Sequence, residues 1–167
     1  MKRINTRLLA SLAFLTALEI VLSRFLSINT WNLKIGFSFV PIAMAAMLFG
    51  PIPAATVAAM ADVIGAILFP SGPFFPGFTL TAFLTGLVFG LFLREKQTPL
   101  RVAGAVLINQ LVLGLLLNTF WISLLYGSAY IPLLITRIGQ CAILIPVQLV
   151  VILVLRRAMT GIRRIQA

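Results

Sequence analysis

Six long apolar runs, separated by short polar or proline-rich breaks, dominate this sequence. The runs cover residues 8–26, 35–49, 54–69, 78–93, 102–125 and 131–155. A helix needs about 20 apolar residues to cross the hydrocarbon core of a bilayer. Only 10% of the 167 residues are charged, too few to cover the surface of a water-soluble protein of this length. The sequence therefore predicts an all-α, polytopic membrane protein, in which six transmembrane helices form a bundle and residues 1–167 a single domain.

Several of these runs are short or interrupted. The second, third and fourth are shorter than a full span, and Pro41 and Pro146 lie inside the second and the last. Such helices are tolerated where neighbouring helices or a cavity satisfy the backbone. The first run follows three basic residues, as the core of a signal peptide does, but Arg24 follows it in place of a small-residue cleavage site. We therefore expect an uncleaved first helix.

Basic residues indicate the orientation of the chain in the membrane. Ten of the thirteen Lys and Arg residues fall in the N-terminal tail, between the fourth and fifth runs, or in the C-terminal tail. With six spans these segments share one side, and excess Lys and Arg in short loops marks the cytoplasmic side. Both termini are therefore predicted to be cytoplasmic. The net charge of +10 reflects this topology, so we expect no nucleic-acid partner.

Five further ionisable residues fall in the outer half of the predicted bundle, namely Arg24, Lys34, Arg137, Glu19 and Asp62. Ionisable groups inside a membrane are costly, and they usually face a partner, the bundle interior or a wet cavity. One interpretation is that the two acids only neutralise two of the cations. Because that pairing leaves one cation over, we also expect a positively biased cavity open to the outside. The three cations are then candidate binding residues for an anionic solute.

Aromatic and polar residues near the predicted outer surface extend the candidate site. The loop FPSGPFFPG carries Phe74 and Phe75 between prolines that stiffen it. These rings either line a pocket or belong to the aromatic belt at the membrane interface. Asn118 lies one turn from Trp121, so both side chains point the same way. The indole could stack on a planar ligand ring while the amide forms hydrogen bonds with its edge. Asp62 suits the same ring, because a carboxylate accepts two parallel N–H bonds.

The sequence offers little for catalysis. It contains no histidine, three acidic residues and one cysteine, Cys141, which lies in an apolar run. This composition excludes a disulfide framework, histidine-based catalysis and most zinc sites. The chain also lacks a nucleophile cluster, a metal or cofactor motif and a Walker A lysine loop. We therefore expect a protein without cofactors that is not an enzyme, and active transport would need a coupled gradient or another polypeptide.

Small residues are spaced so that helices can approach closely. In the first run Ala13 and Ala17 form a small-xxx-small element, and Gly86 and Gly90 have the same spacing in the fourth run. Such pairs let two helix backbones come close together. The glycines are predicted to pack inside the bundle. The alanines fit either a contact inside the bundle or an interface with a partner.

Two stretches of the chain carry a family resemblance. They are LSRFLSINTWNLKIGFSFVPIAMAAMLFGP and AMADVIGAILFPSGPFFPGFTLTAFLTGLVFGLFL. Their most specific parts are SRFLSINT, KIGFSFVP and LFPSGPFFPGFTLTA. The chain resembles, over nearly its whole length, the folate-specific substrate-binding subunits (S components) of energy-coupling factor transporters.

The resemblance implies a six-helix, vitamin-binding bundle that partners a membrane coupling subunit (EcfT) and two ATPases. In that family an AxxxA element of the first helix docks the coupling subunit, and it matches Ala13 and Ala17. A family arginine associated with ligand binding matches Arg24. Folate also fits the residues above, because the outer cations suit its glutamate tail and the acid, amide and indole suit its pterin. Three alternatives stay open: an S component for another vitamin or pterin-like solute, a small membrane enzyme, and a solitary gradient-driven carrier.

Overall fold

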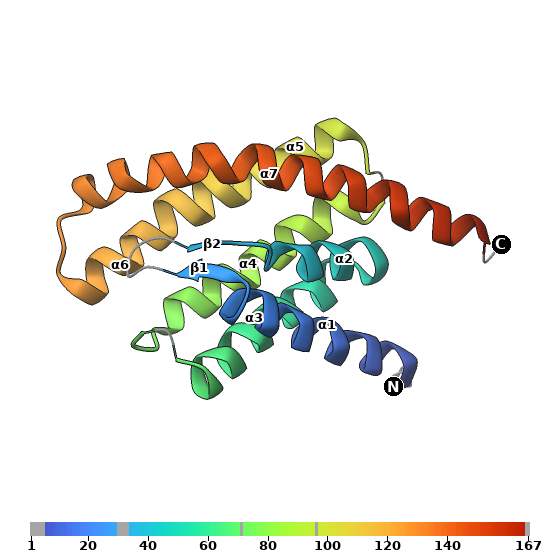
Figure 1. Cartoon of the computed structure of the whole chain (residues 1–167), viewed down its shortest axis with the longest axis horizontal. Coiled ribbons are helices and arrows are strands. Elements are labelled where there is room, and N and C mark those ends of the chain that lie inside the picture. The colour runs from blue at the N-terminus through green and yellow to red at the C-terminus, as the bar shows by residue number, and fades with distance from the viewer. Residues whose placement is uncertain (1–5, 30–33, 71, 96, 166–167) are drawn as a thin grey trace.

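Long helices and one small hairpin make up the structure. The computed structural model describes residues 6–29, 34–70, 72–95 and 97–165. In chain order the elements are α1 (Thr6–Arg24), β1 (Ser27–Asn29), β2 (Lys34–Gly36), α2 (Phe39–Phe49), α3 (Pro51–Leu68), α4 (Pro76–Leu93), α5 (Pro99–Leu107), η1 (Ile108–Leu117), α6 (Asn118–Tyr126) and α7 (Tyr130–Ile165). The start of α1 and the end of α7 lie at the same end of the bundle (Figure 1).

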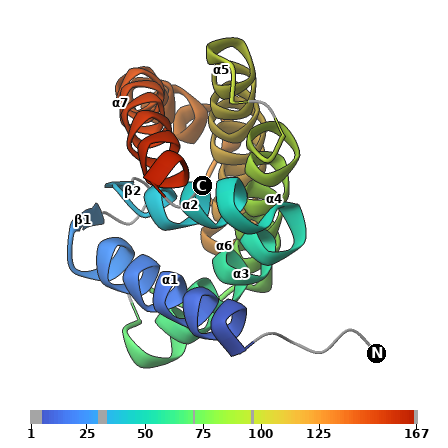
Figure 2. The same ribbon diagram turned by 90° about the vertical axis from the view of Figure 1, so that its right-hand side faces the viewer.

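The helices coincide with the six apolar runs. Within the described ranges, five helical segments are long and apolar enough to cross a membrane, and one of them is the continuous stretch Pro99–Tyr126 formed by α5, η1 and α6. The remaining run forms α2, a shorter apolar helix of 11 residues. Seen end-on, α2 and α4 lie between α1 and α3 on one side and α5 and α7 on the other (Figure 2). The predicted all-α, six-helix architecture is confirmed.

Prolines determine where three of the helices begin. The first residues of α3, α4 and α5 are Pro51, Pro76 and Pro99. Proline suits this position because its φ angle is already helical and its missing N–H has no intrahelical partner there. The breaks expected from the sequence are therefore the N-termini of the following helices.

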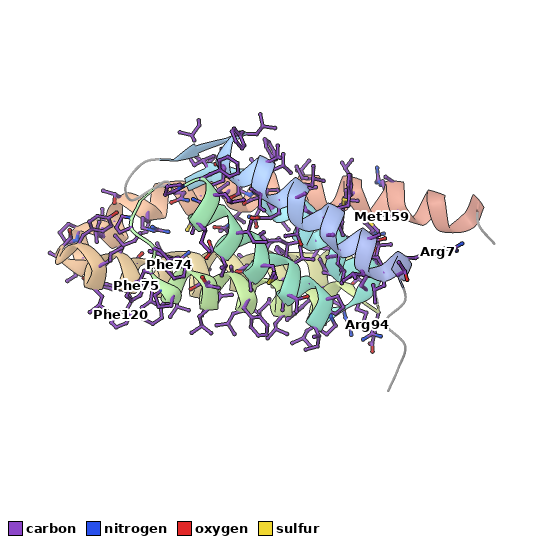
Figure 3. All side chains as sticks on the ribbon, turned by 90° about the horizontal axis from the view of Figure 1, so that it is seen from below. Arg7, Phe74, Phe75, Arg94, Phe120 and Met159 are labelled. Carbon is purple, nitrogen blue, oxygen red and sulfur yellow. The ribbon has the colours of Figure 1, made fainter. Side chains whose placement is uncertain are left out.

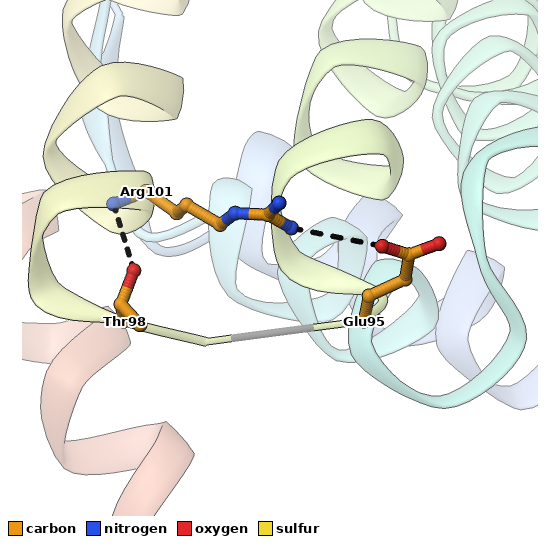
Figure 4. A network of polar contacts seen from close by, with 3 residues as sticks. All are labelled: Glu95, Thr98 and Arg101. Carbon is orange, nitrogen blue, oxygen red and sulfur yellow. Dashed lines mark hydrogen bonds and ion pairs between the residues drawn. The ribbon is translucent and has the colours of Figure 1, made fainter.

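The loop between α4 and α5 lies at the end of the bundle where α1 starts and α7 ends. This end carries Arg7 and Arg94 and is called the basic end below. Thr98 caps α5 by accepting a hydrogen bond from the backbone N–H of Arg101 at 3.4 Å. The Arg101 guanidinium reaches back to the Glu95 carboxylate at 3.9 Å (Figure 4). Both side chains are well exposed, so this ion pair contributes little to stability. Arg7 and Arg94 lie at this end, whereas Phe74, Phe75 and Phe120 lie at the opposite end (Figure 3).

The fifth span changes its hydrogen-bond pattern in the middle. Over the 10 residues Ile108–Leu117 it is a π-helix, which ends where the N–H of Asn118 bonds to the carbonyl of Leu113, five residues back. Such segments are rare and often occur at functional sites. The hydrophobic pattern of the run gave no indication of this change.

A short antiparallel hairpin joins α1 to α2. Ser27 pairs with Gly36, Ile28 with Ile35 and Asn29 with Lys34. The sequence analysis did not predict it, because strands of three residues are too short to show an alternating pattern. The hairpin places β2 next to the beginning of α2 (Figure 1).

Helices α3 and α4 pack with their backbones almost in contact, as the glycine spacing predicts. A Cβ added to Gly86 would lie 2.5 Å from the carbonyl oxygen of Ala54. A Cβ added to Gly90 would overlap the backbone of Pro51. Both glycines are buried. The prediction that they pack inside the bundle is confirmed, and the contact lies in the half of α4 nearer Arg94.

Replacing Gly90 by valine is expected to destabilise the protein. The added side chain would meet backbone atoms of Pro51, which cannot rotate away, and overpacking of this kind costs roughly 1–3 kcal/mol. Thermal unfolding of the detergent-solubilised protein measures the effect. Gly139→Val is the matched control, because no atom lies within 4 Å of a Cβ added there. Equal thermal midpoints for the two variants would contradict the close packing.

Candidate functional site

A cavity of about 190 Å³ lies between the hairpin end and α2, α4, η1 and α7. Its lining is partly polar, although these helices are otherwise apolar. The residues that line it are Gly36, Ser38, Phe39, Ile42, Thr81, Thr85, Phe89, Asn109, Gln110, Gly114, Asn118, Arg137, Gln140, Cys141, Leu144 and Gln148. Because six elements contribute, namely β2, α2, α4, η1, α6 and α7, the cavity depends on the whole bundle being assembled.

Helical spacing places one face of each wall toward the cavity. From α4, Thr81, Thr85 and Phe89 line it at intervals of four residues. Residues three or four positions apart share a helix face, and the same rule brings 137, 141, 144 and 148 of α7 to one side. Both cavity-facing stripes mix polar with apolar side chains. This is the arrangement expected of a binding site and not of a purely apolar helix contact.

Arg137 is a buried cation in the wall of this cavity. Its side chain is 6% exposed, and its Nη2 donates to the carbonyl oxygen of Gly114 in η1 at 3.0 Å. One turn further along α7, the Cys141 thiol donates to the carbonyl of Gln110 at 3.5 Å. Two side chains four residues apart thus bond to two carbonyls four residues apart. These contacts hold α7 against the π-helical segment.

Carboxamides in the lining have polar atoms without a hydrogen-bond partner in the protein. Among the residues that the structure describes, the buried Oδ1 and Nδ2 of Asn109, Oδ1 of Asn118 and Oε1 of Gln148 make no hydrogen bond. Asn109 and Gln148 are each 6% exposed. Buried polar atoms in native proteins are nearly always hydrogen-bonded. A cavity surrounded by such atoms is suited to a ligand that carries its own donors and acceptors.

An aromatic group lies beside the cavity, next to Thr81. The indole N–H of Trp121 donates to Oγ1 of Thr81 at 3.1 Å, so the ring is tied to a cavity-lining residue. Phe75 lies next to this indole, with ring centroids 5.5 Å apart, and Phe120 lies on it at 5.1 Å. Phe74 is 54% exposed. The structure therefore brings Phe75 and Trp121 together, next to the cavity lining, and leaves Phe74 on the surface.

Arg24 and Asp62 make their contacts elsewhere in the bundle. Arg24 ends α1, and its guanidinium lies over Gly65 of α3, where an added Cβ would come 2.9 Å from Nε. Asp62 accepts a hydrogen bond from Thr79 Oγ1 at 2.7 Å, which links α3 to α4. Neither residue is in the cavity lining. Lys34 begins β2, and its side chain falls outside the part of the chain that is described.

Of the eight predicted binding residues, Asn118 and Arg137 meet in the cavity lining. The sequence analysis missed the amides Asn109, Gln140 and Gln148, because it searched the spans for ionisable groups and considered an amide only where it lay beside an aromatic residue. The signal was present, since a carboxamide inside an apolar run also needs a partner. Thr81 and Thr85 were missed for a different reason. A threonine hydroxyl can bond within its own helix, as Thr85 does with the carbonyl of Thr81, so threonines in a span indicate little by themselves.

A second surface of interest lies on α1. Leu15, Glu19 and Ser23 form its buried face, at intervals of four residues. Ala13 and Ala17 are exposed on a different face. Within the described residues, Ala13 and Ala17 therefore do not pack against another helix. The alternative of packing within the bundle loses its support.

A known family of transporter components matches most of this chain. The family described as "ECF transporter, substrate-specific component" matches residues 7–156. The chain belongs to this family. A substrate-specific component is a membrane protein, which agrees with the apolar helices, and the predicted multi-pass location in a membrane is confirmed at this level.

Two relatives and one solved structure show which members of the family the chain is similar to. The chain is 43% identical over 153 residues to the "Folate transporter FolT" of Clostridium novyi (strain NT), covering 91% of this chain and 88% of that protein. It is 35% identical over 153 residues to the "Folate transporter FolT" of Leuconostoc mesenteroides subsp. mesenteroides, covering 87% and 82%. A solved structure described as "Crystal structure of FolT bound with folic acid" superposes with a TM-score of 0.86 at 37% identity, covering 90% of this chain and 93% of that one.

Proposed function

We propose that this substrate-specific component binds folate from the outer side of the membrane and delivers it for uptake by an ATP-driven ECF transporter. The observation that carries the proposal is the cavity itself. It combines a buried guanidinium with carboxamides beside an aromatic group, in a chain whose fold superposes on that of a FolT bound with folic acid. An anionic, planar and hydrogen-bonding ligand suits this lining.

Folate has three chemically distinct parts, and the site offers a partner to each. The glutamate tail carries two carboxylates, which suit cations at the outer end, where Arg24 ends α1, Lys34 begins β2 and Arg137 lies in the cavity wall. Charge-assisted hydrogen bonds to such groups are among the stronger ones. The aminobenzoyl bridge is apolar and flat, which suits the rings of Phe75 and Trp121. The pterin suits the carboxamides.

The contributions of Asp62 and Phe74 are proposed to be indirect. Asp62 joins α3 to α4 through Thr79, so it stabilises the helix that carries Thr81. Phe74 is exposed at the end of the bundle that carries Phe75 and Phe120, in the loop that joins α3 to α4 (Figure 3). We therefore expect substitution of either residue to weaken binding less than substitution of Arg137.

Transport would require partners, because the chain carries no nucleotide-binding motif. We propose that a membrane coupling subunit docks on the exposed face of α1 that carries Ala13 and Ala17, and that two ATPase subunits supply the energy. Small residues on a lipid-facing helix let a second helix approach closely. The common position of the α1 start and the α7 end, at the basic end of the bundle, supports termini on the cytoplasmic side (Figure 1).

The deciding experiment is identification of the bound solute. The purified protein is expected to retain folate, detected by mass spectrometry, and to bind added folate in calorimetry. Pantothenate and riboflavin are the matched controls, and neither should compete. Recovery of another vitamin would support an S component of different specificity instead. ATP-dependent uptake in vesicles with coupling partners, and no uptake without them, would exclude a solitary gradient-driven carrier.

A further inference from the structure

Three helices converge at the basic end of the bundle, away from the cavity. Leu93 of α4, Val102 of α5 and Met159 of α7 are buried together in the hydrophobic core. Arginines stand next to these core positions in the sequence, namely Arg94, Arg101, Arg156 and Arg157. Because the three helices pack on one another at this level, the arginines lie at a similar height along the bundle.

The loop between α4 and α5 brings cations of α5 and α7 to one place. Nη1 of Arg156 donates to the carbonyl oxygen of Gln97 in this loop at 2.5 Å, and α7 runs beside the loop (Figure 4). Arg101 lies one turn into α5, and its guanidinium is 3.9 Å from the Glu95 carboxylate, too far for a good hydrogen bond. Arg157 is exposed on α7. We call Arg101, Arg156 and Arg157 the α5–α7 arginine cluster.

The charge of the basic end is not balanced within the chain. Ten of the thirteen Lys and Arg residues belong to this end, but of the three acidic residues only Glu95 does. Glu19 follows the start of α1 by 13 residues and Asp62 follows the start of α3 by 11, which is about 20 Å and 16 Å along the helices. So much charge of one sign repels itself and attracts anions from outside the protein.

Exposed apolar side chains indicate what kind of anion fits. Leu100, next to Arg101, is 84% exposed, and Val154, one turn before Arg157, is also exposed. Residues three positions apart share a helix face, so apolar and cationic side chains stand together on the sides of the helices. This pattern matches the boundary of a membrane, where acyl chains meet charged headgroups and arginines extend toward the headgroups. An acidic protein surface would leave the apolar side chains against charge.

We propose that the α5–α7 arginine cluster binds the phosphate group of an anionic phospholipid. Guanidinium groups suit this ligand because their planar donors pair with two phosphate oxygens at once. Basic pockets between transmembrane helices bind anionic headgroups in the same way. Glu95 competes with the phosphate for Arg101. This lipid site is separate from the folate cavity and does not depend on the identity of the transported solute.

The test titrates detergent-solubilised protein with phosphatidylglycerol and measures bound lipid by native mass spectrometry and the thermal midpoint. Phosphatidylcholine with the same acyl chains is the neutral comparison, and inorganic phosphate is the soluble one. Phosphatidylglycerol is expected to bind more tightly than either and to raise the midpoint. Arg101→Gln and Arg157→Gln should each lower its affinity about 5-fold, and the double variant about 25-fold. Folate affinity should stay unchanged in these variants, which shows that they are folded.

Two further variants make the test specific. Arg7→Gln removes one charge from the same end, but on α1, which lies across the bundle from α5 and α7, so the lipid affinity should change little (Figure 2). Glu95→Gln removes the competing carboxylate and keeps every arginine, so the affinity should rise. If the double glutamine variant does not fold, Glu95→Gln decides the question, and an unchanged or lower affinity overturns the proposal.

Other outcomes would also overturn it. Equal losses in Arg7→Gln and Arg101→Gln would show diffuse attraction to net charge instead of a site. Equal binding of phosphatidylcholine would exclude recognition of charge, and an equal effect of inorganic phosphate would leave a site for a free anion. Preferential binding of a polyglutamate peptide over phosphatidylglycerol would make this surface an interface for an acidic protein.

Discussion

Replacing Ala13 and Ala17 together by leucine is expected to abolish ATP-dependent folate uptake while leaving folate binding to the isolated protein unchanged. Both residues are exposed on α1 and lie apart from the cavity lining, so the added side chains have room in the isolated protein. They would, however, separate α1 from a partner helix that approaches at small residues. Folate affinity in detergent and uptake with coupling partners, measured on the same double variant, provide the check.

Ala142→Leu is the matched control for this variant. Ala142 is exposed on α7, so this change adds a leucine side chain to the surface of a different helix and should support normal uptake. Pull-down of the coupling subunit should fall for the α1 variant only. A parallel loss of binding, uptake and thermal stability in the α1 variant would show that the alanines pack within the bundle, because overpacking costs roughly 1–3 kcal/mol.

Arg137→Gln is expected to weaken folate binding by about two orders of magnitude. A hydrogen bond to a charged group contributes roughly 1.5–3 kcal/mol, and each 1.4 kcal/mol corresponds to a factor of ten. The same change removes the bond to the Gly114 carbonyl, so some loss of order in η1 adds to the effect. Calorimetry with folate and with 6-methylpterin separates the two contributions, because only folate carries carboxylates.

Arg157→Gln controls for the loss of one positive charge from α7. Arg157 is exposed near the basic end, so folate affinity should not change. Arg137→Lys, which keeps the charge but loses the planar fork of donors, should have an intermediate affinity. Equal losses for folate and 6-methylpterin in Arg137→Gln would contradict contact with the glutamate tail and would leave Arg137 a structural link between α7 and η1.

The elements of the fold follow closely from the sequence. Apolar runs and prolines predict where each helix lies, since the need to satisfy the backbone in lipid leaves helices as the only spanning structure available to such segments. Gly86 and Gly90 predict a tight helix contact because nothing but a small residue fits one. The β1–β2 hairpin and the π-helix were not predictable, because neither depends on a pattern of apolar residues.

The candidate site is predicted less completely than the fold. Arg137 and Asn118 are recognisable because polar groups are rare in their runs, and both line the cavity. Arg24 and Asp62 are equally conspicuous in the sequence but lie outside its lining, since the side a residue faces depends on how its helix is rotated against its neighbours. The roles of all these residues in binding stay predictions.

The π-helix also affects how related sequences should be aligned. Each carbonyl in η1 bonds five residues ahead instead of four, so the segment uses more residues per turn than the α-helices on either side. The relative rotation of α5 and α6 is thereby set by the length of η1. Gain or loss of one residue there would turn α6 by about 100° against α5, without breaking the span. The Trp121 indole would then no longer reach Thr81 to donate its hydrogen bond. Single-residue gaps in this segment of an alignment would therefore mark homologues whose cavity wall is arranged differently.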